Sequence, residues 1–269
     1  MSDFVGGLAS RQVAALRVVL VSYPLAMVVL GVMAAIDGGT ISGPAVLWGV
    51  LCGISQGLGV WWFYAALGAG PISVVSPLTA ILAAGVPLAV GLGLGERPGA
   101  TAGVGAVLAL AAVVLVSREA TDEDVRPHRF TRRVAWLTVG AGLAFGLNFV
   151  FVAQAPVDAR LWPLFFGRVA ATVFVVVAAA LTGNLRPPQG VPLRLAVLAA
   201  VLDVGANVTM LWALQASMLS LSSVLMSLYP AATVLLAIVV LRERVTRWQA
   251  LGMVTACAAI ALISTAGVH

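Results

Sequence analysis

Residues 51–67 read LCGISQGLGVWWFYAAL, and residues 198–214 read LAAVLDVGANVTMLWAL. A shift of 147 positions aligns these stretches, and the same shift continues to align residues 51–117 with residues 198–264. The aligned pairs include Ser73 and Ser220, Ser76 and Ser223, Glu96 and Glu243, Gly105 and Gly252, and Ser117 and Ser264. Both copies are almost wholly apolar. A duplicated apolar unit is typical of pseudosymmetric membrane proteins that have a binding site where the two halves meet.

The composition leaves too little polar surface for a water-soluble domain. Charged residues make up 9% of the 269 residues and hydrophobic residues 61%, whereas a soluble domain contains about 25% charged residues. The apolar runs have about the 20 residues that a helix needs to cross about 30 Å of hydrocarbon. We therefore predict an all-α, polytopic membrane protein embedded in the lipid bilayer.

Nine apolar segments are long enough to be full spans. They are residues 18–36, 44–67, 72–94, 100–116, 134–153, 161–181, 195–214, 219–241 and 248–266. With a shift of 145, residues 1–10 match only the second half of the segment 134–153, and ten helical residues reach about 15 Å. We therefore expect a truncated first helix, and we favour a misplaced start site over a genuine nine-span protein.

The arginines predict the orientation of the chain. All 15 basic residues are arginines, and loops on one side carry twelve of them, whereas loops on the other side carry only Arg97 and Arg160. The positive-inside rule places the twelve in the cytoplasm, so the net charge of +5 reflects topology rather than nucleic-acid binding. Glu96 and Glu243 then lie on opposite faces, as an inverted repeat with an odd number of spans per half requires. We expect both glutamates to be structural, each anchoring its turn or bonding backbone amides of the next helix.

The second copy carries Ser222-Ser223-Val224-Leu225, Tyr229-Pro230, Leu241-Arg242-Glu243-Arg244 and Gln249-Ala250-Leu251-Gly252. These residues resemble the EamA-like transporters, a branch of the drug/metabolite transporter (DMT) superfamily. The resemblance implies a ten-helix fold of two inverted five-helix bundles, and transport of substrates that range from amino acids to other metabolites and toxic compounds. It divides the chain into a first repeat at 1–117 with a truncated first helix, a cytoplasmic linker at 118–133 and a second repeat at 134–269.

Asp203 is the most informative side chain, because it lies near the middle of a predicted span. An ionised carboxylate there costs about 2.5–3.5 kcal/mol, so such residues usually face a cavity or a partner. We favour a functional role in proton coupling; the alternative is a structural ion pair with Arg168, in which Asp203 stays charged and carries no proton. Arg168, whose counterpart in the first repeat is Tyr23, would hold a substrate carboxylate or pair with Asp203, and we favour pairing.

Three amides extend this candidate site. Asn207 follows Asp203 by one helical turn and shares its face, and Gln56 is the repeat counterpart of Asp203. Asn148 lies in the first span of the second repeat, at the position that matches Asp3. We predict that these residues bind a polar substrate, with ordinary interhelical hydrogen bonding as an equally weighted alternative.

Trp61 and Trp62 are further candidates, because indole rings that line a cavity can stack on an amphipathic substrate. Anchoring at the membrane interface is the commoner use of tryptophan and is the alternative. Glycines that recur every fourth residue predict close helix packing. They are Gly91, Gly95, Gly99 and Gly103, and Gly142 and Gly146.

Together these features predict a secondary transporter of small polar or amphipathic metabolites in the plasma (inner) membrane, working by alternating access. Export is favoured only through the resemblance, and protons as the coupling ion or passive transport both stay open. The sequence has no His, Cys, Asp and Glu cluster for catalysis, so we expect no enzyme activity, metal or cofactor, and a monomer or homodimer. A non-transporting or truncated membrane protein and a membrane enzyme acting on a lipid-linked substrate are the alternatives.

Overall fold

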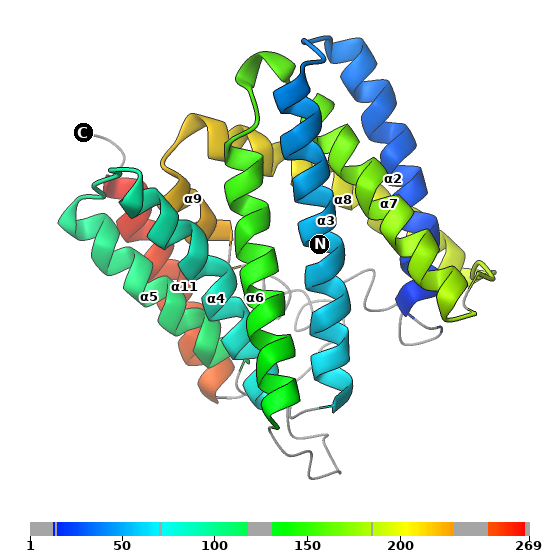
Figure 1. Ribbon diagram of the computed structural model, residues 1–269. Coiled ribbons are helices and arrows are strands. Elements are labelled where there is room, and N and C mark those ends of the chain that lie inside the picture. Colours follow the sequence, from blue (N-terminus) through cyan, green and yellow to red (C-terminus); the bar gives the residue numbers. More distant parts are fainter. Residues whose placement is uncertain are drawn as a thin grey trace. The chain divides into compact units, whose positions relative to one another are not determined.

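A computed structural model describes residues 13, 15–69, 72–117, 131–183, 185–226, 228 and 247–266. In this part of the chain every regular element is helical (Figure 1). The elements are α2 (Ala15–Asp37), α3 (Gly43–Ala69), α4 (Ile72–Gly93), α5 (Ala100–Ser117), α6 (Arg132–Ala153), the short 3-10 helix η1 (Val157–Ala159), α7 (Trp162–Leu181), α8 (Val191–Ala216), α9 (Leu219–Met226) and α11 (Arg247–Ala266).

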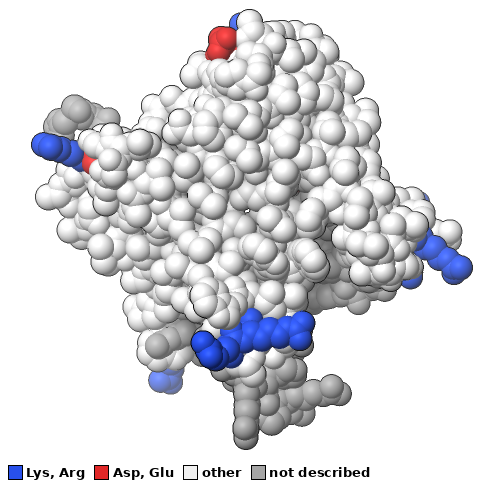
Figure 2. Space-filling model, viewed as in Figure 1, with Lys and Arg blue, Asp and Glu red and all other residues white. Residues whose placement is uncertain are grey.

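Several of these helices can cross a bilayer. Among the described residues, five helices are long and apolar enough by length and composition: Leu16–Asp37, Gly43–Phe63, Arg132–Ala153, Trp162–Leu181 and Val191–Ala216. Large apolar side chains are exposed along them, as lipid-facing surface requires, and Figure 2 shows a face that is almost entirely uncharged. The prediction of a multi-pass helical membrane protein is confirmed.

Some predicted segments fall outside the described residues. They are the truncated first helix at 1–10, most of the linker at 118–133, and, apart from residue 228, the predicted span 219–241 beyond Met226 with Tyr229 and Pro230, together with Glu243. The other eight predicted spans agree with α2 to α8 and α11 to within a few residues at each end. The turn after α2 uses Gly38 and Gly39, whose φ angles of 81° and 95° are strained for residues with a side chain.

The helices recur at the spacing of the sequence repeat. The starts of α2, α4 and α5, at Ala15, Ile72 and Ala100, lie 147 residues before the starts of α7, α9 and α11. The start of α3 precedes that of α8 by 148 residues. These eight helices therefore form four pairs of counterparts: α2 with α7, α3 with α8, α4 with α9 and α5 with α11.

The described helices form two compact units that differ from the predicted repeats. Unit 1 comprises Met1–Gly57 and Phe151–Gln215, and unit 2 comprises Leu58–Val150 and Ala216–His269. Unit 1 contains α2, the first part of α3, η1, α7 and nearly all of α8, and unit 2 contains most of the remaining helical residues. Each unit thus takes helices from both copies of the sequence.

Counterpart helices run antiparallel in unit 1. Tyr23, in the middle of α2, contacts Arg168 of α7, and Asp37, at the end of α2, contacts Arg160 just before α7 begins. As the residue numbers rise along α2, the contacting residues therefore fall along α7. Figure 1 shows these two helices side by side.

Glycines bring α3 and α7 into close contact within unit 1. Gly49, Gly53 and Gly57 lie one helical turn apart, and they face Pro163, Gly167 and Phe174 in that order. A Cβ atom on Gly53 would lie only 2.1 Å from the carbonyl oxygen of Gly167. Small residues let helix backbones approach this closely in membrane proteins.

Unit 2 is packed with small apolar residues. Its core joins α5 and α11 with α9 and the residue at 228: Ala106, Ala109, Ala112, Val113, Val224, Leu228, Ala256, Ala259 and Ile263. Gly105, near the start of α5, faces Ile263, near the end of α11, so these counterparts also run antiparallel. The backbone amide of Leu219 at the start of α9 donates to Glu96 Oε1, just after α4 ends, at 2.7 Å.

The hydrogen bond to Glu96 partly confirms the prediction for this residue. The carboxylate does bond a backbone amide, but the amide belongs to the counterpart of its own helix rather than to the helix that follows.

The glycines that were predicted to pack closely have two different outcomes. Gly142 and Gly146 face Leu82 and Val86 closely, as predicted, whereas Gly95, Gly99 and Gly103 have no described atom within 4 Å of a Cβ position, so close packing is wrong there.

Candidate functional site

Arg168 is the centre of the candidate site. It follows Gly167 on α7, where the glycine lets α3 approach, and its side chain is only 3% exposed. Its Nη2 donates to Asp203 Oδ2 of α8 at 2.5 Å, and its Cζ lies 4.7 Å from the centroid of the Tyr23 ring. The guanidinium is therefore held by an opposite charge and by the face of an aromatic ring. The predicted pairing of Arg168 with Asp203 is confirmed.

The pair does not use all the hydrogen-bonding capacity of the arginine. Arg168 Nη1 is buried, and among the described residues it has no hydrogen-bond partner. The same holds for Thr172 Oγ1, one turn further along α7. A buried donor without a partner costs about 1–3 kcal/mol, and more when it is charged. The site therefore retains a charged donor that a ligand can satisfy.

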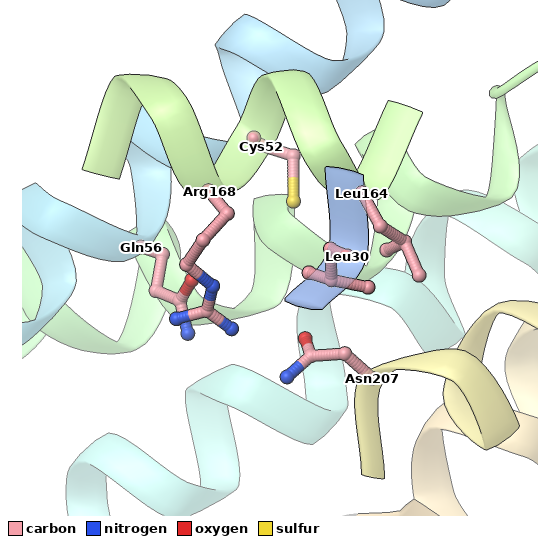
Figure 3. Close-up of a pocket in the computed structure, with 7 residues that line it drawn as sticks. Leu30, Cys52, Gln56, Leu164, Arg168 and Asn207 are labelled. Atoms are coloured by element: carbon pink, nitrogen blue, oxygen red, sulfur yellow. The ribbon is translucent and has the colours of Figure 1, made fainter. Parts of the chain in front are cut away.

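A narrow pocket lies beside this donor in unit 1. Its lining residues are Leu30, Cys52, Gln56, Leu164, Gly167, Arg168 and Asn207. Figure 3 shows the polar ends of Gln56, Arg168 and Asn207 turned toward a common space. The free space within it holds about one water molecule. Three of the seven predicted site residues, Gln56, Arg168 and Asn207, thus line one pocket. A fourth, Asp203, is joined to the pocket through its ion pair with Arg168.

The helix α8 positions Asp203 and Asn207 together. The two residues are four positions apart on one face, and Asn207 Nδ2 donates to the backbone oxygen of Asp203 at 2.8 Å. This bond fixes the amide next to the carboxylate. The Asp203 side chain is 25% exposed, so it is less enclosed than its arginine partner.

The remaining predicted site residues belong to unit 2 and are not among the residues that line this pocket. Trp61 is 59% exposed. Trp62 is half-buried and packs against Gly140, where a Cβ atom would lie 2.8 Å from its ring. Asn148 is half-buried on α6.

A second polar cluster in unit 1 has no signal in the sequence. It joins the loop after α2 to the loop before α7: Thr40 Oγ1 donates to Asp158 Oδ2 at 2.5 Å, and Arg160 Nη1 donates to the backbone oxygen of Asp37. Arg160 adopts a left-handed backbone conformation with φ of 49° in this cluster. The contacts link residues more than 100 positions apart, so only the fold brings them together.

Comparison with known proteins identifies the family. The model of the EamA-like transporter family matches residues 132–265, which is nearly the whole of the predicted second repeat. The chain belongs to the EamA-like transporter family, in agreement with the DMT superfamily resemblance, and is a multi-pass membrane protein of a transporter family.

Solved structures support the fold alone. A crystal structure described only as that of a protein matches with a TM-score of 0.77 and 16% sequence identity, and the match covers 97% of this chain and 90% of the other. No match was found among curated proteins.

Proposed function

We propose that this protein is a secondary carrier that exports small polar or amphipathic metabolites across the plasma (inner) membrane by alternating access. The observation that carries the proposal is the buried Arg168–Asp203 pair beside a pocket in a chain of a transporter family. Ionisable groups at membrane depth usually mark a substrate or ion pathway. The export direction is proposed from the family resemblance alone.

We propose further that the chain is built from two inverted repeats in the ten-helix arrangement of the family. The antiparallel contacts of α2 with α7, α4 with α9 and α5 with α11 support this, because each pair consists of sequence counterparts. An inverted repeat provides two equivalent conformations, one open to each side of the membrane. The arginine distribution supports a cytoplasmic linker at 118–133.

The Arg168–Asp203 ion pair affects which energy source can drive transport. Arg168 Nη2 donates to Asp203 Oδ2 at 2.5 Å, so the carboxylate is already engaged in holding the arginine. We therefore propose that Asp203 acts through Arg168, and that transport does not depend on proton transfer at Asp203.

Transport in proteoliposomes tests this function. Solutes that stabilise the purified protein, from a panel of amino acids, sugars, nucleosides and cationic drugs, would be followed across the membrane with and without an imposed pH gradient. We expect transport that is independent of the gradient, and a lower rate for Asp203→Asn. The control is Thr209→Val on the same helix, because the exposed Thr209 hydroxyl bonds, within the described part of the chain, only backbone oxygens of its own helix.

Two results would contradict the proposal in different ways. If no solute in the panel crosses the membrane faster than in protein-free vesicles, the carrier function is wrong. If a pH gradient drives transport by the wild-type protein and this dependence is lost in Asp203→Asn, the carrier function holds and Asp203 carries the proton.

A further inference from the structure

We propose that two loops of unit 1 form a latch that closes the outer end of the pocket and releases it when the carrier opens to the outside. The latch consists of the contacts between residues 37–40, at and after the end of α2, and residues 158–160, just before α7. This inference rests on the proposed function, because only a pocket that opens in turn to each side of the membrane needs a gate. It assigns the gate on one side to particular residues.

The two loops of the latch meet through side-chain and backbone contacts. Thr40 Oγ1 donates to Asp158 Oδ2 at 2.5 Å, and the backbone amide of Thr40 donates to the backbone oxygen of Asp158 at 3.0 Å. Arg160 Nη1 donates to the backbone oxygen of Asp37 and lies 3.4 Å from Asp37 Oδ1. The Arg160 and Asp37 side chains are 56% and 42% exposed, so water competes for both and their ion pair is weak. Contacts of this kind hold two loops together and still release them.

The backbone of the latch is suited to a switch. Gly38 and Gly39 have φ angles of 81° and 95°, and a Cβ atom on Gly39 would lie 3.0 Å from the backbone oxygens of Asp158 and Ala159. Arg160 has a φ of 49°, which is rare for a residue with a side chain. Unfavourable backbone conformations are concentrated at functional and switch regions, where surrounding contacts must maintain them. Opening the latch would release the contacts that hold Arg160 in this conformation.

The latch lies beyond one end of the pocket. Leu30 of α2 lines the pocket, and the latch residue Asp37 follows it after seven residues, or about 10 Å along the helix. Leu164 of α7 also lines the pocket, and the latch residue Arg160 precedes it by four residues. Because α2 and α7 run antiparallel, both latch residues lie at the same end of this helix pair. The latch therefore holds two pocket-lining helices together at that end.

Aromatic rings form a layer between the latch and the pocket. The ring centroids of Trp162, Phe165 and Phe166 lie within 6.0 Å of one another. Phe165 faces Gly31 of α2, and Phe166 faces Gly49 of α3, where a Cβ atom would lie 3.0 Å and 2.9 Å from the two side chains. Both glycines lie, in chain order, between the latch and the residues that line the pocket. An opening at this end therefore has to separate these rings as well as the two loops.

The arginine distribution predicts that this end faces outside. The loops at 38–42 and 154–161 lie on the side whose loops carry only Arg97 and Arg160, and the positive-inside rule places the arginine-rich loops in the cytoplasm. The closed latch therefore corresponds to a carrier that is shut toward the outside.

Modification of Cys52 in the pocket wall measures whether the latch is open. Cys257 would be replaced by serine in every variant, so that Cys52 is the sole thiol. Thr40→Val with Arg160→Gln removes the side-chain contacts of the latch. Sealed right-side-out and inside-out vesicles would be treated with a membrane-impermeant maleimide. We expect the outside rate to rise about fivefold or more, the factor for one net hydrogen bond, and the inside rate not to rise.

Glu96→Ala is the matched control. It removes the hydrogen bond to the Leu219 amide, which also joins two helix ends on the predicted outer side but belongs to unit 2. A general loss of stability would act in both variants, whereas loss of the latch acts only at the pocket of unit 1. We therefore expect Glu96→Ala to leave both rates unchanged.

A metal lock tests the latch in the opposite direction. Thr40→His with Asp158→His places two imidazoles where the backbone nitrogen and oxygen already meet at 3.0 Å, and Zn²⁺ binds imidazole nitrogen. We expect Zn²⁺ to lower the outside rate in this variant, EDTA to restore it, and Zn²⁺ to have no effect on the parent protein. The comparison is made within one folded protein, so it remains decisive if the first variant fails to fold.

The outcomes separate the latch from the carrier function. An outside rate that does not rise without the latch contacts, that does not fall with Zn²⁺, or that rises equally in Glu96→Ala overturns the latch, and so does a rise in the inside rate alone. Labelling needs no substrate, so it is independent of the transport assay. If the latch fails but a solute is transported, the carrier function stands with its gate elsewhere. If labelling shows the latch but no solute crosses the membrane, the gate stands and the carrier function fails.

Discussion

The two compact units pair their helices in the same way, but they bury different kinds of side chain. In both units, counterpart helices from the two copies pack antiparallel. Unit 1 encloses the guanidinium of Arg168, bonded to Asp203 beside a pocket. The described part of unit 2 buries mainly alanine, valine, leucine and isoleucine side chains, with the hydroxyls of Thr79, Thr138 and Ser222 and no charged side chain.

The polar site of unit 1 lies where the two copies of the sequence differ. The sequence counterparts of Arg168 and Asp203 are Tyr23 and Gln56, and neither is charged. Both counterparts nevertheless lie at the same site, with Tyr23 against the guanidinium and Gln56 in the pocket wall. The site thus departs from the repeat in its side chains.

The largest expected effect comes from breaking the ion pair. Arg168→Leu leaves Asp203 without its partner and should lower the free energy of unfolding by about 3 kcal/mol, near the lower end for a buried pair because Asp203 is 25% exposed. Unfolding in detergent measures this loss. The double variant Arg168→Leu with Asp203→Leu should recover most of it, and a double variant as unstable as the single one would show that the pair is not the cause.

Glycine substitutions compare the packing of the two units. Gly53→Ala should cost about 1–3 kcal/mol, because its Cβ would meet the backbone of Gly167 at 2.1 Å. Gly105→Ala in unit 2 should cost less, since its nearest contact is the Ile263 side chain at 2.8 Å, which can rotate.

The control for these substitutions is Gly205→Ala on α8, where no atom of the described residues lies within 4 Å of the Cβ position. This change should stabilise the helix by up to about 1 kcal/mol. Equal losses at Gly53 and Gly105 in thermal unfolding would contradict the difference in packing that we describe.

The smallest expected effect concerns Glu96 in unit 2. Glu96→Ala removes the acceptor for the Leu219 amide and should lower the free energy of unfolding by about 1 kcal/mol. Glu96→Gln keeps an oxygen acceptor and should cost less. Arg97→Ala, which alters the exposed neighbour, is the control. A loss for Arg97→Ala as large as that for Glu96→Ala would show that the hydrogen bond is not responsible.

Much of the helical organisation is predictable because hydrocarbon thickness fixes helix length. The predicted segment 100–116 is close to α5, and 161–181 is close to α7. The prediction is less accurate for α8, which begins at Val191 rather than at 195, because a helix tolerates Pro192 in its first turn. The exposed Arg194 is equally compatible with that first turn, so neither residue marks the true helix start.

The site is predictable where a single residue carries the signal. A charge within an apolar run implies a partner, so the Arg168–Asp203 pair follows from the sequence. The contact between Thr40 and Asp158 does not, because it depends on how two distant loops meet. The close approach at Gly49, Gly53 and Gly57 was also missed, although their four-residue spacing is the pattern that the sequence offers for it.

The same pattern failed at Gly95, Gly99 and Gly103. Gly95 follows the end of α4 with a φ of 94°, and Gly99 precedes α5. At these two turn positions glycine is selected for backbone conformation rather than for helix contact, whereas Gly103 lies inside α5 and this reason does not apply to it. Spacing alone therefore does not separate the two uses.

Alternating access requires the pocket in unit 1 to open in turn to each side of the membrane, and Cys52 in its wall provides a direct test. The exposed Cys257 would first be replaced by serine, so that Cys52 is the sole thiol. Sealed right-side-out and inside-out vesicles would then be treated with a membrane-impermeant thiol reagent. We expect the reagent to modify Cys52 in both preparations. Modification from only one side, or from neither while the denatured protein reacts fully, would rule out alternating access through this pocket.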